Sequence, residues 1–226
     1  MAIQHSDHRT HSLATFTGLF VALVVPFLTF VAGQAFFGAE LSSARVFFGL
    51  AFHWISLAAL VAIVLWWERR PLQSIGLRLV RWWTIPAGLL AGIAIMILSG
   101  SLVSVLRLSL DANFVSYMQS LPFLIRALVV VTAGMFEETL YRGYALERLT
   151  TIWGSKWLAG MATVAVFTLA HLPTVGISHL LPVVIISILV TLLYLWRRDL
   201  ILNMVAHSTI DAVGLLLAPI ARHGVH

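Results

Sequence analysis

The chain has no cysteine and little charge. With no Cys among its 226 residues, disulfides and thiolate chemistry are excluded. Charged residues make up 10% of the chain and hydrophobic residues 60%, with a mean hydropathy of +0.97, whereas soluble globular proteins carry about 25% charged residues. A linker, a low-complexity tract and a clear internal repeat are also lacking. These features exclude an ordinary soluble domain and indicate a polytopic membrane protein.

The basic balance of the chain does not indicate nucleic-acid binding. The formal net charge is +5 and the isoelectric point about 10.4, but the lysines and arginines sit in short connections between apolar stretches. That distribution is typical of membrane topology rather than of a binding tail. We therefore expect membrane lipid around the protein and no nucleic-acid partner.

Apolar stretches of about 20 residues, each long enough to cross a bilayer, recur along the whole length. We predict an all-α, polytopic transmembrane helical bundle of about seven spans, at residues 13–37, 46–67, 82–106, 121–149, 156–179, 180–196 and 200–219. Residues 1–12 are predicted to form a polar N-terminal tail, residues 13–120 the first three transmembrane helices, and residues 121–220 a four-helix part of the same membrane domain. The last turns of the fourth span, with Glu147 and Arg148, are predicted to emerge into the interface.

The basic residues predict an orientation, because cytoplasmic connections carry an excess of Lys and Arg. A cytoplasmic N-terminus places most of them on the cytoplasmic side: Arg9, Arg69, Arg70, Arg78, Arg81, Arg142, Arg148, Lys156, Arg197 and Arg198. The other side receives Arg45, Arg107, Arg126 and Arg222. Most tryptophans fall at the same predicted cytoplasmic ends, as an aromatic belt would: Trp66, Trp67, Trp82, Trp83, Trp153, Trp157 and Trp196. Both patterns predict that the N-terminus is cytoplasmic.

A few polar side chains fall at membrane depth. They are Glu137, Glu138, Asp211, His53, His171 and His207. A charged side chain at the bilayer centre costs roughly 2.5–3.5 kcal/mol on insertion scales, so such residues are usually functional. His53 lies on a span with no other strong polar group, and we predict a structural or pore-lining role for it. His179, in a predicted loop, is assigned a structural role too.

Helical spacing separates the two adjacent glutamates. Glu138 and Arg142 lie four residues apart and share a helix face, which predicts a structural salt bridge. Glu137 is rotated from Glu138 by about 100° and points elsewhere. Without a local partner, Glu137 must be protonated, paired across helices or hydrated, and an intramembrane carboxylate of this kind is a functional candidate.

The same spacing predicts further pairs on later spans. Phe167 and His171 share a face on the fifth span, and His207 shares one with Asp211 on the seventh, where Asn203 precedes His207 by one turn. A Glu, two His and an Asp that converge on one hydrated cavity would be able to activate water.

These side chains predict attack of water on an amide. Glu137 is the candidate general base, and His171 shares the water or protonates the leaving amine. His207, oriented by Asp211, would donate a hydrogen bond to the developing oxyanion, an interaction worth roughly 2.7–4 kcal/mol per donor in other enzymes.

The motifs Glu137-Glu138-Thr139-Leu140-Tyr141-Arg142, Phe167-Thr168-Leu169-Ala170-His171 and His207-Ser208-Thr209-Ile210-Asp211 fit the patterns EExxxR, FxxxH and HxxxN/D. In this order and on separate spans, they resemble the signature of the CAAX protease and bacteriocin-processing (CPBP) family of intramembrane endopeptidases. The resemblance covers residues 121–219 and implies that residues 121–220 are the catalytic part. It implies catalytic roles for Glu137, His171, His207 and Asp211, with Glu138, Arg142, Phe167 and Asn203 as supporting residues.

The position of Asp211 leaves two chemistries open. Prenyl proteases of this family carry Asn there, and an ionised Asp cannot donate to an oxyanion, so Asp211 must be protonated or act through His207. Alternatively, Glu137, His171, His207 and Asp211 would ligate Zn²⁺. We favour a metal-free, glutamate-dependent mechanism without a cofactor.

The sequence thus predicts a CAAX prenyl protease-like hydrolase that cleaves a peptide or prenylated peptide near the membrane surface. We expect it in a prokaryotic plasma membrane, with the active site toward the cytoplasmic side. The alternatives are a proton-coupled transporter, since Glu, His and Asp also form proton relays, and a non-catalytic bacteriocin-immunity or scaffold protein on the same fold.

Overall fold

The computed structural model describes residues 2–38, 40, 42–107, 113–177 and 180–217, and this part of the chain is helical. The α-helices, in chain order, are α1 (Ala2–Leu23), α2 (Val25–Phe37), α3 (Ser43–Ala62), α4 (Thr84–Val105), α5 (Asn113–Ser120), α6 (Phe123–Glu137), α7 (Glu147–Trp153), α8 (Lys156–Val175), α9 (Leu180–Arg197) and α10 (Leu200–Ala212). Wider or tighter turns form η1 (Ile63–Trp67), η2 (Leu72–Ile75), η3 (Glu138–Leu146) and η5 (Val213–Leu217). The all-α prediction is therefore confirmed.

The predicted first span is split into two helices. α1 ends at Leu23 and α2 begins at Val25, with Pro26 in its first turn and a bend of 47° between them. Proline cannot donate a backbone hydrogen bond to the preceding turn but fits the first turn of a new helix, which explains the break. The segment predicted as an N-terminal tail belongs to α1, which starts at Ala2.

α10 packs against α4, α6 and α9, and two glycines allow the closest of these approaches. A Cβ at Gly134 of α6 would lie 2.1 Å from Oγ of Ser208, and a Cβ at Gly92 of α4 would lie 2.5 Å from the carbonyl oxygen of Ala206. Small residues at such contacts let the backbones of membrane helices approach closely. This packing fixes the position of α10 beside α6.

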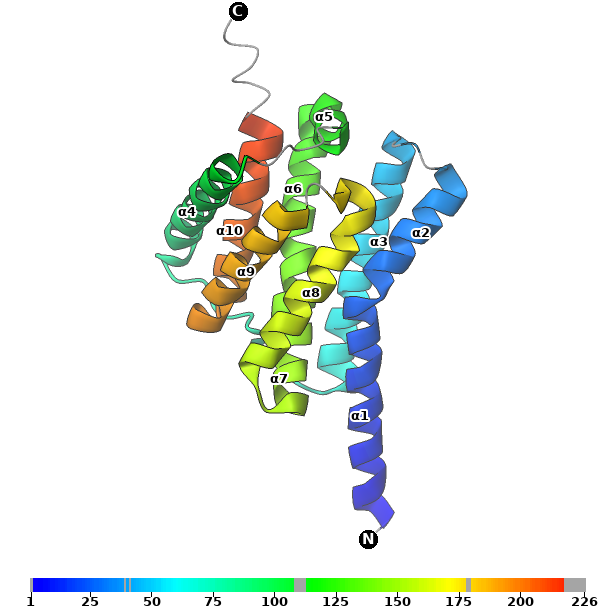
Figure 1. Cartoon of the computed structure of the whole chain (residues 1–226). Helices are drawn as coiled ribbons and strands as arrows, with labels where there is room; N and C mark the ends of the chain where they lie inside the picture. The colour runs from blue at the N-terminus through cyan, green and yellow to red at the C-terminus, as the bar shows by residue number, and fades with distance from the viewer. Residues whose placement is uncertain (1, 39, 41, 108–112, 178–179, 218–226) are drawn as a thin grey trace, which may run out of the picture.

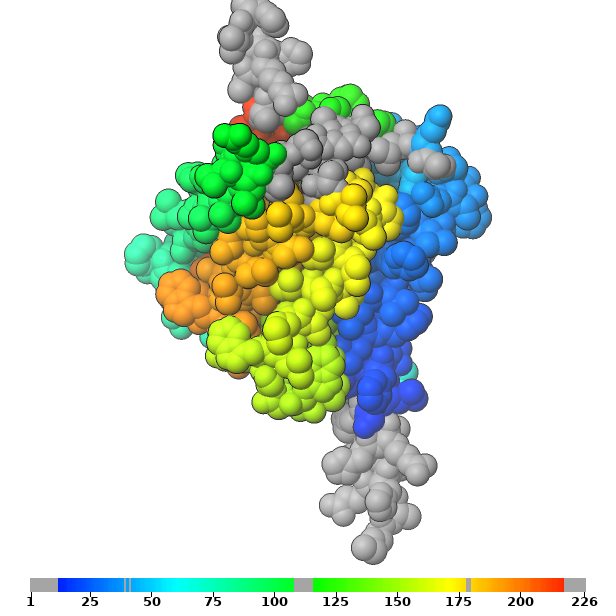
Figure 2. Space-filling view, in the orientation of Figure 1, coloured from blue at the N-terminus to red at the C-terminus, as the bar shows by residue number. Residues whose placement is uncertain are grey.

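The bundle has two distinct ends (Figure 1). We call the lower one the α7 end; α3, α6 and α9 run toward it, while α4, α8 and α10 start from it. The upper one, where α5 lies, is the α5 end. On the face shown in Figure 2, α8 lies between α9 and the α1–α2 pair.

Five helical segments are long and apolar enough to cross a membrane, or six if the bent pair counts as one span. They are residues 43–67, 84–105, 156–175, 180–197 and 200–217, with the bent pair at residues 12–37. The protein is thus an integral membrane protein, but the predicted count of seven is not reached by this measure. The missing segment is α6 with η3 and α7, which carries both glutamates and Arg142.

The end of the predicted fourth span is buried inside the protein. Glu147 and Arg148 pair with Arg198 and Glu68 respectively, and Arg142 is buried too. Their predicted emergence into the membrane interface stays a prediction. The last two residues of the predicted final span, and the predicted positions of His179 and Arg222, lie outside the described residues.

Candidate active site

The two glutamates lie where the backbone changes from an α-helix to a π-helix. Glu137 is the last residue of α6, and Glu138 is the first residue of η3, a π-helical stretch that ends at Leu146. Wide π turns inside a helix are often found at functional sites. Here the change of pitch lets neighbouring carboxylates face different surroundings: Glu138 is fully buried, whereas Glu137 faces a cavity.

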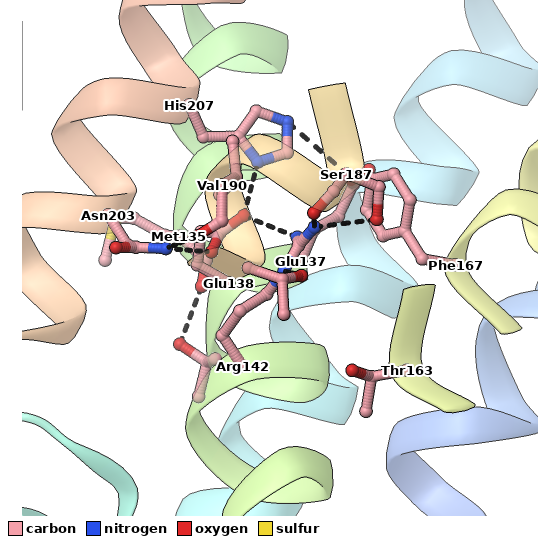
Figure 3. A network of polar contacts seen from close by, with 12 residues as sticks. Met135, Glu137, Glu138, Arg142, Thr163, Phe167, Ser187, Val190, Asn203 and His207 are labelled. Atoms are coloured by element: carbon pink, nitrogen blue, oxygen red, sulfur yellow. Dashed lines mark hydrogen bonds and ion pairs between the residues drawn. The ribbon is translucent and has the colours of Figure 1, made fainter. Parts of the chain in front are cut away.

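Glu138 is the centre of a buried polar network (Figure 3). Its Oε1 accepts from Nη1 of Arg142 at 2.7 Å, which is the ion pair expected from the i, i+4 spacing. Its Oε2 accepts from Nδ2 of Asn203 at 3.1 Å, and the same amide donates to the carbonyl of Val190 at 2.9 Å. The network connects η3 to α9 and α10 and satisfies a carboxylate with no access to water.

His207 is held by Glu138 rather than by Asp211. Nδ1 of His207 lies 2.7 Å from Oε1 of Glu138, a hydrogen-bond distance, while Oδ2 of Asp211 lies 3.7 Å from Nε2. The distance to Asp211 is too long for a direct hydrogen bond. The direct hydrogen bond to the ring thus comes from Glu138, with Asp211 at ion-pair distance from the other nitrogen, and the orienting role of Asp211 stays a prediction.

Glu137 lies between the two predicted histidines. Its Oε2 is 3.8 Å from Nε2 of His171 and 3.7 Å from Nε2 of His207, and it makes no direct hydrogen bond to the described residues. Polar atoms separated by 3.7–3.8 Å often share a bridging water molecule. The structure thus brings together residues from α6, α8 and α10 that are far apart in the sequence.

Phe167 organises the ring of His171 and the guanidinium of Arg142. Nδ1 of His171 lies 2.8 Å from the carbonyl oxygen of Phe167, and since a carbonyl only accepts, Nδ1 carries the proton there. Nε2 of the neutral ring is then the unprotonated nitrogen, and it faces Glu137. The Phe167 ring also stacks on the guanidinium of Arg142 at 4.6 Å from its centroid.

A cavity of about 530 Å³ opens from this site. Glu137, His171, His207 and Asp211 line it, so all four predicted catalytic residues share one space. The remaining lining comes from α2, α3, α5, α6, α8, α9, α10 and η5, and from Tyr141 of η3. The other residues of η3 are buried and do not line the cavity. The cavity therefore extends from Glu137 toward the α5 end.

His53 belongs to this site, although its sequence context gave little sign of it. Its ring stacks on Phe136 with centroids 4.1 Å apart, and both residues line the cavity beside Glu137. The signal in the sequence was a single polar aromatic residue in an otherwise apolar span. The position of His53 agrees with the predicted structural or pore-lining role, and His53 is the third histidine in the walls of the cavity.

Glu68 forms a second buried network that sequence reasoning missed. Its carboxylate accepts from Nη2 of Arg148 at 2.6 Å, from the hydroxyl of Tyr144 at 2.8 Å and from the hydroxyl of Thr15 at 2.9 Å. Burial alone would raise the pKa of Glu68, but the hydrogen bonds and charge of Arg148, with both hydroxyls, hold this pKa below its usual 4.5. The network ties α1 and the α3–α4 connection to α7 at the α7 end.

The predicted alternative of a zinc site does not fit this arrangement. Among the described residues, no three or more His, Asp and Glu side chains are placed so that they could hold a metal ion. We therefore derive no step of the chemistry through a metal.

A comparison with protein families identifies the part of the chain that carries this site. Residues 119–213 match the family described as type II CAAX prenyl endopeptidase Rce1-like, whereas curated proteins and solved structures gave no match. The matched region runs from α5 to the end of α10, and it contains all three motifs with the glutamates and histidines described above. Membership of this family implies an intramembrane protease that acts on a peptide substrate. The chain therefore carries, at residues 119–213, a domain of the Rce1-like type II CAAX prenyl endopeptidase (CPBP) family.

Proposed function

We propose that the protein is an intramembrane endopeptidase in which Glu137 activates a water molecule for attack on a peptide bond. The observation that carries the proposal is the position of Oε2 of Glu137, 3.8 and 3.7 Å from the Nε2 atoms of two histidines on the wall of a cavity. A water molecule bound by these atoms can lose a proton to Glu137 while it attacks, and general-base catalysis of this kind contributes about 10²- to 10⁴-fold in rate.

The two histidines receive different roles because their Nδ1 atoms have different partners, a backbone carbonyl for His171 and the carboxylate of Glu138 for His207. His171 donates from Nδ1 to a carbonyl, so its Nε2 accepts from the attacking water. His207 donates from Nδ1 to Glu138, and its Nε2 donates only when the ring carries both protons. We propose that the doubly protonated His207 donates the hydrogen bond to the oxyanion. The proton for the leaving amine then comes either from His207 or from Glu137, which has taken one from the water.

Asp211 lines the cavity without a direct hydrogen bond to His207. We propose that it stabilises the positive charge on the His207 ring through space, since an opposite charge 3.7 Å away favours the charged form. Glu138, Arg142, Asn203 and Phe167 hold the two histidines in place and do not touch the substrate.

Peptide cleavage by purified protein in proteoliposomes tests this assignment. We expect Glu137→Gln and His171→Gln to abolish cleavage of fluorogenic peptides, unmodified or farnesylated, while the variants still bind the uncleaved peptide. A non-catalytic scaffold would bind the peptide and cleave it in neither form, and a transporter would move it across the bilayer without cleavage. Retained cleavage by folded Glu137→Gln would refute the role of Glu137.

We further propose seven membrane crossings, with α6, η3 and α7 together as the crossing that carries the charged site. The positive-inside rule then puts the α7 end, with its arginine-rich connections and exposed Trp66, Trp82 and Trp196, in the cytoplasm together with the N-terminus. In this orientation the cavity extends from Glu137 toward the opposite side, because it reaches the α5 end. We therefore propose that the peptide reaches Glu137 from the non-cytoplasmic side, in place of the cytoplasmic approach expected from the sequence.

The absence of cysteine makes this orientation simple to test. Leu79, at the α7 end, is 89% exposed, and Val105, at the α5 end, is 77% exposed. In intact cells, we expect a membrane-impermeant maleimide to label Val105→Cys and to spare Leu79→Cys until the cells are opened. The reverse pattern would show that the α7 end faces outward and would restore a cytoplasmic entrance.

A further inference from the structure

Two arginines meet on one tryptophan ring at the α7 end. The guanidinium of Arg197, in the last turn of α9, stacks on the ring of Trp83 at 4.6 Å from its centroid. The guanidinium of Arg81 lies over the same ring at 5.9 Å from the centroid. Trp83 directly precedes the first residue of α4, and α4 packs against α9. Arg81, Trp83 and Arg197, which we call the arginine–tryptophan cluster, therefore join the end of one helix to the start of another.

The two guanidiniums have no negative partner in the part of the chain that the structure describes. Neither Arg81 nor Arg197 forms an ion pair with a carboxylate there. The neighbouring side chains are engaged elsewhere, since Arg198 pairs with Glu147 and Asp199 caps the first turn of α10. The shared ring keeps the two charges within about one Debye length, roughly 10 Å at 0.1 M salt, so they repel each other. An anion beside both would relieve this repulsion, and phosphate oxygens also accept hydrogen bonds from guanidinium N–H groups.

Both arginines of the cluster are held in place before a ligand binds. The backbone N–H of Arg81 donates to Oγ1 of Thr84 at 3.1 Å, and the carbonyl of Arg81 accepts from the backbone N–H of Thr84 at 3.0 Å. Thr84 is fully buried, so this closed turn fixes the backbone from which the Arg81 side chain starts. Arg197 also lies over a second ring, that of Trp196, at 5.0 Å from its centroid. Side chains restricted in this way lose less conformational entropy when they bind an anion.

The side chains around the cluster place it among lipid headgroups. Trp82, the neighbour of Trp83, is 89% exposed, and Trp196 is 75% exposed. Both lie at the ends of helices that are long and apolar enough to cross a membrane, where tryptophan rings sit at the level of the headgroups. A phosphate ion in solution gains nothing from these apolar rings, whereas the chains of a phospholipid lie against them. The surroundings therefore favour a lipid phosphate as the anion.

We propose that the arginine–tryptophan cluster binds the phosphate of one anionic phospholipid, such as phosphatidylglycerol. None of its three residues lines the cavity of Glu137, so the site is separate from the proposed chemistry and does not depend on it. Arg197 binds the phosphate from the end of α9, and Arg81 binds it from the connection before α4. Both helices pack against α10, the helix that carries His207. One lipid molecule thus fastens together two of the helices that position α10.

Titration of the purified protein with lipid in detergent, followed by native mass spectrometry, tests this proposal. Wild-type protein should bind one molecule of phosphatidylglycerol about 20- to 30-fold more tightly than phosphatidylcholine, whose choline group offsets the charge of its phosphate. This size corresponds to about fivefold for each arginine near an anionic lipid. Inorganic phosphate, added at the same concentration as the lipid, should leave the bound phosphatidylglycerol in place.

Variants separate a built site from general attraction to a basic surface. Arg81→Gln and Arg197→Gln should each lower the preference for phosphatidylglycerol about fivefold, and the double variant should abolish it. Trp83→Leu keeps both charges but removes the ring that gathers them, so it should lose part of the preference. Arg197→Lys, which keeps the charge without the planar guanidinium, should do the same with the ring intact. Arg70→Gln is the matched control, because Arg70 is exposed at the same end of the bundle, and it should bind as wild type does.

Three results would overturn the proposal. Equal affinity of wild-type protein for the two lipids would show that the cluster does not bind an anionic lipid. Equal losses in Arg70→Gln and Arg81→Gln, or the full preference in both Trp83→Leu and Arg197→Lys, would show that the lipid responds to the overall charge of this end of the bundle. Displacement of the lipid by inorganic phosphate would assign the cluster to a phosphate ion from solution.

Discussion

The same substitution at two neighbouring positions should have very different effects on stability. Glu137→Gln and Glu138→Gln each replace a carboxylate by an amide of nearly the same shape. Glu138 is fully buried and accepts hydrogen bonds from Arg142, His207 and Asn203, whereas Oε2 of Glu137 has no hydrogen-bond partner among the described residues. Only Glu138→Gln therefore leaves a buried arginine without its counter-charge.

The size of the difference follows from these contacts. Removal of one partner from a buried ion pair costs about 3–5 kcal/mol. For a chain of this length, about 1 kcal/mol corresponds to a shift of 2–4 °C in Tm, so we expect Glu138→Gln to unfold about 6–20 °C below wild type. Glu137→Gln breaks no hydrogen bond at Oε2 and should stay within about 2 °C, since a substitution without such a contact changes stability by about 0.5 kcal/mol.

Activity should separate the two variants in a different way. Glu137→Gln should lose about 10²- to 10⁴-fold in cleavage rate at the temperature where both variants are folded, because the proposed base is gone. Glu138→Gln should lose activity as well, because His207 is no longer held. The measurement is unfolding in detergent followed by tryptophan fluorescence at one scan rate, with cleavage assayed on the same samples. Equal unfolding temperatures for the two variants, or a large drop for Glu137→Gln alone, would refute this division of roles.

Three further predictions concern other parts of the structure. Because the pKa of Glu68 is lowered on folding, its contribution to stability is complete above about pH 4.5 and is lost as the pH falls through the lower folded-state value. The Tm of the wild-type protein should therefore fall with pH in that range. Glu68→Gln should be destabilised at neutral pH, and its Tm should depend less on pH. Gly134→Ala should be destabilised because the added methyl group meets Oγ of Ser208, and Ser208→Gly should restore much of the loss in the double variant, whereas additive effects would contradict this contact. Cleavage should survive treatment with a chelator, and loss of activity that zinc restores would instead require a metal site.

The candidate catalytic residues could be predicted from the sequence because their spacing along single helices is visible there. Glu137, His171 and His207 lie at membrane depth on three helices, where ionisable side chains are costly and rarely occur without a function. The ion pair of Glu138 with Arg142 also follows from spacing on one helix. Contacts within a single helix, and motifs in a fixed order, are the information that a sequence displays directly.

The contacts between helices were not accessible in this way. The hydrogen bond from His207 to Glu138 depends on the π turns of η3, and no residue pattern in the sequence predicts these turns. Spacing on one helix therefore suggested Asp211 as the partner of His207. Glu68 was hidden among the arginines of a connection, yet its partner Arg148 comes from a segment 80 residues later. Such pairs are set by how helices pack, and the pitch of a turn decides which neighbour a side chain meets.

The cavity that Glu137 lines reaches from it toward the α5 end, where Met118 and Leu215 also line it. If the protein is the peptidase proposed above, a product fragment that stays in this cavity would occupy the space that the next substrate needs. The product should then act as a competitive inhibitor. A bulky group attached at Phe30, which lines the same cavity, would lower turnover without a change to any atom at the site of the proposed chemistry.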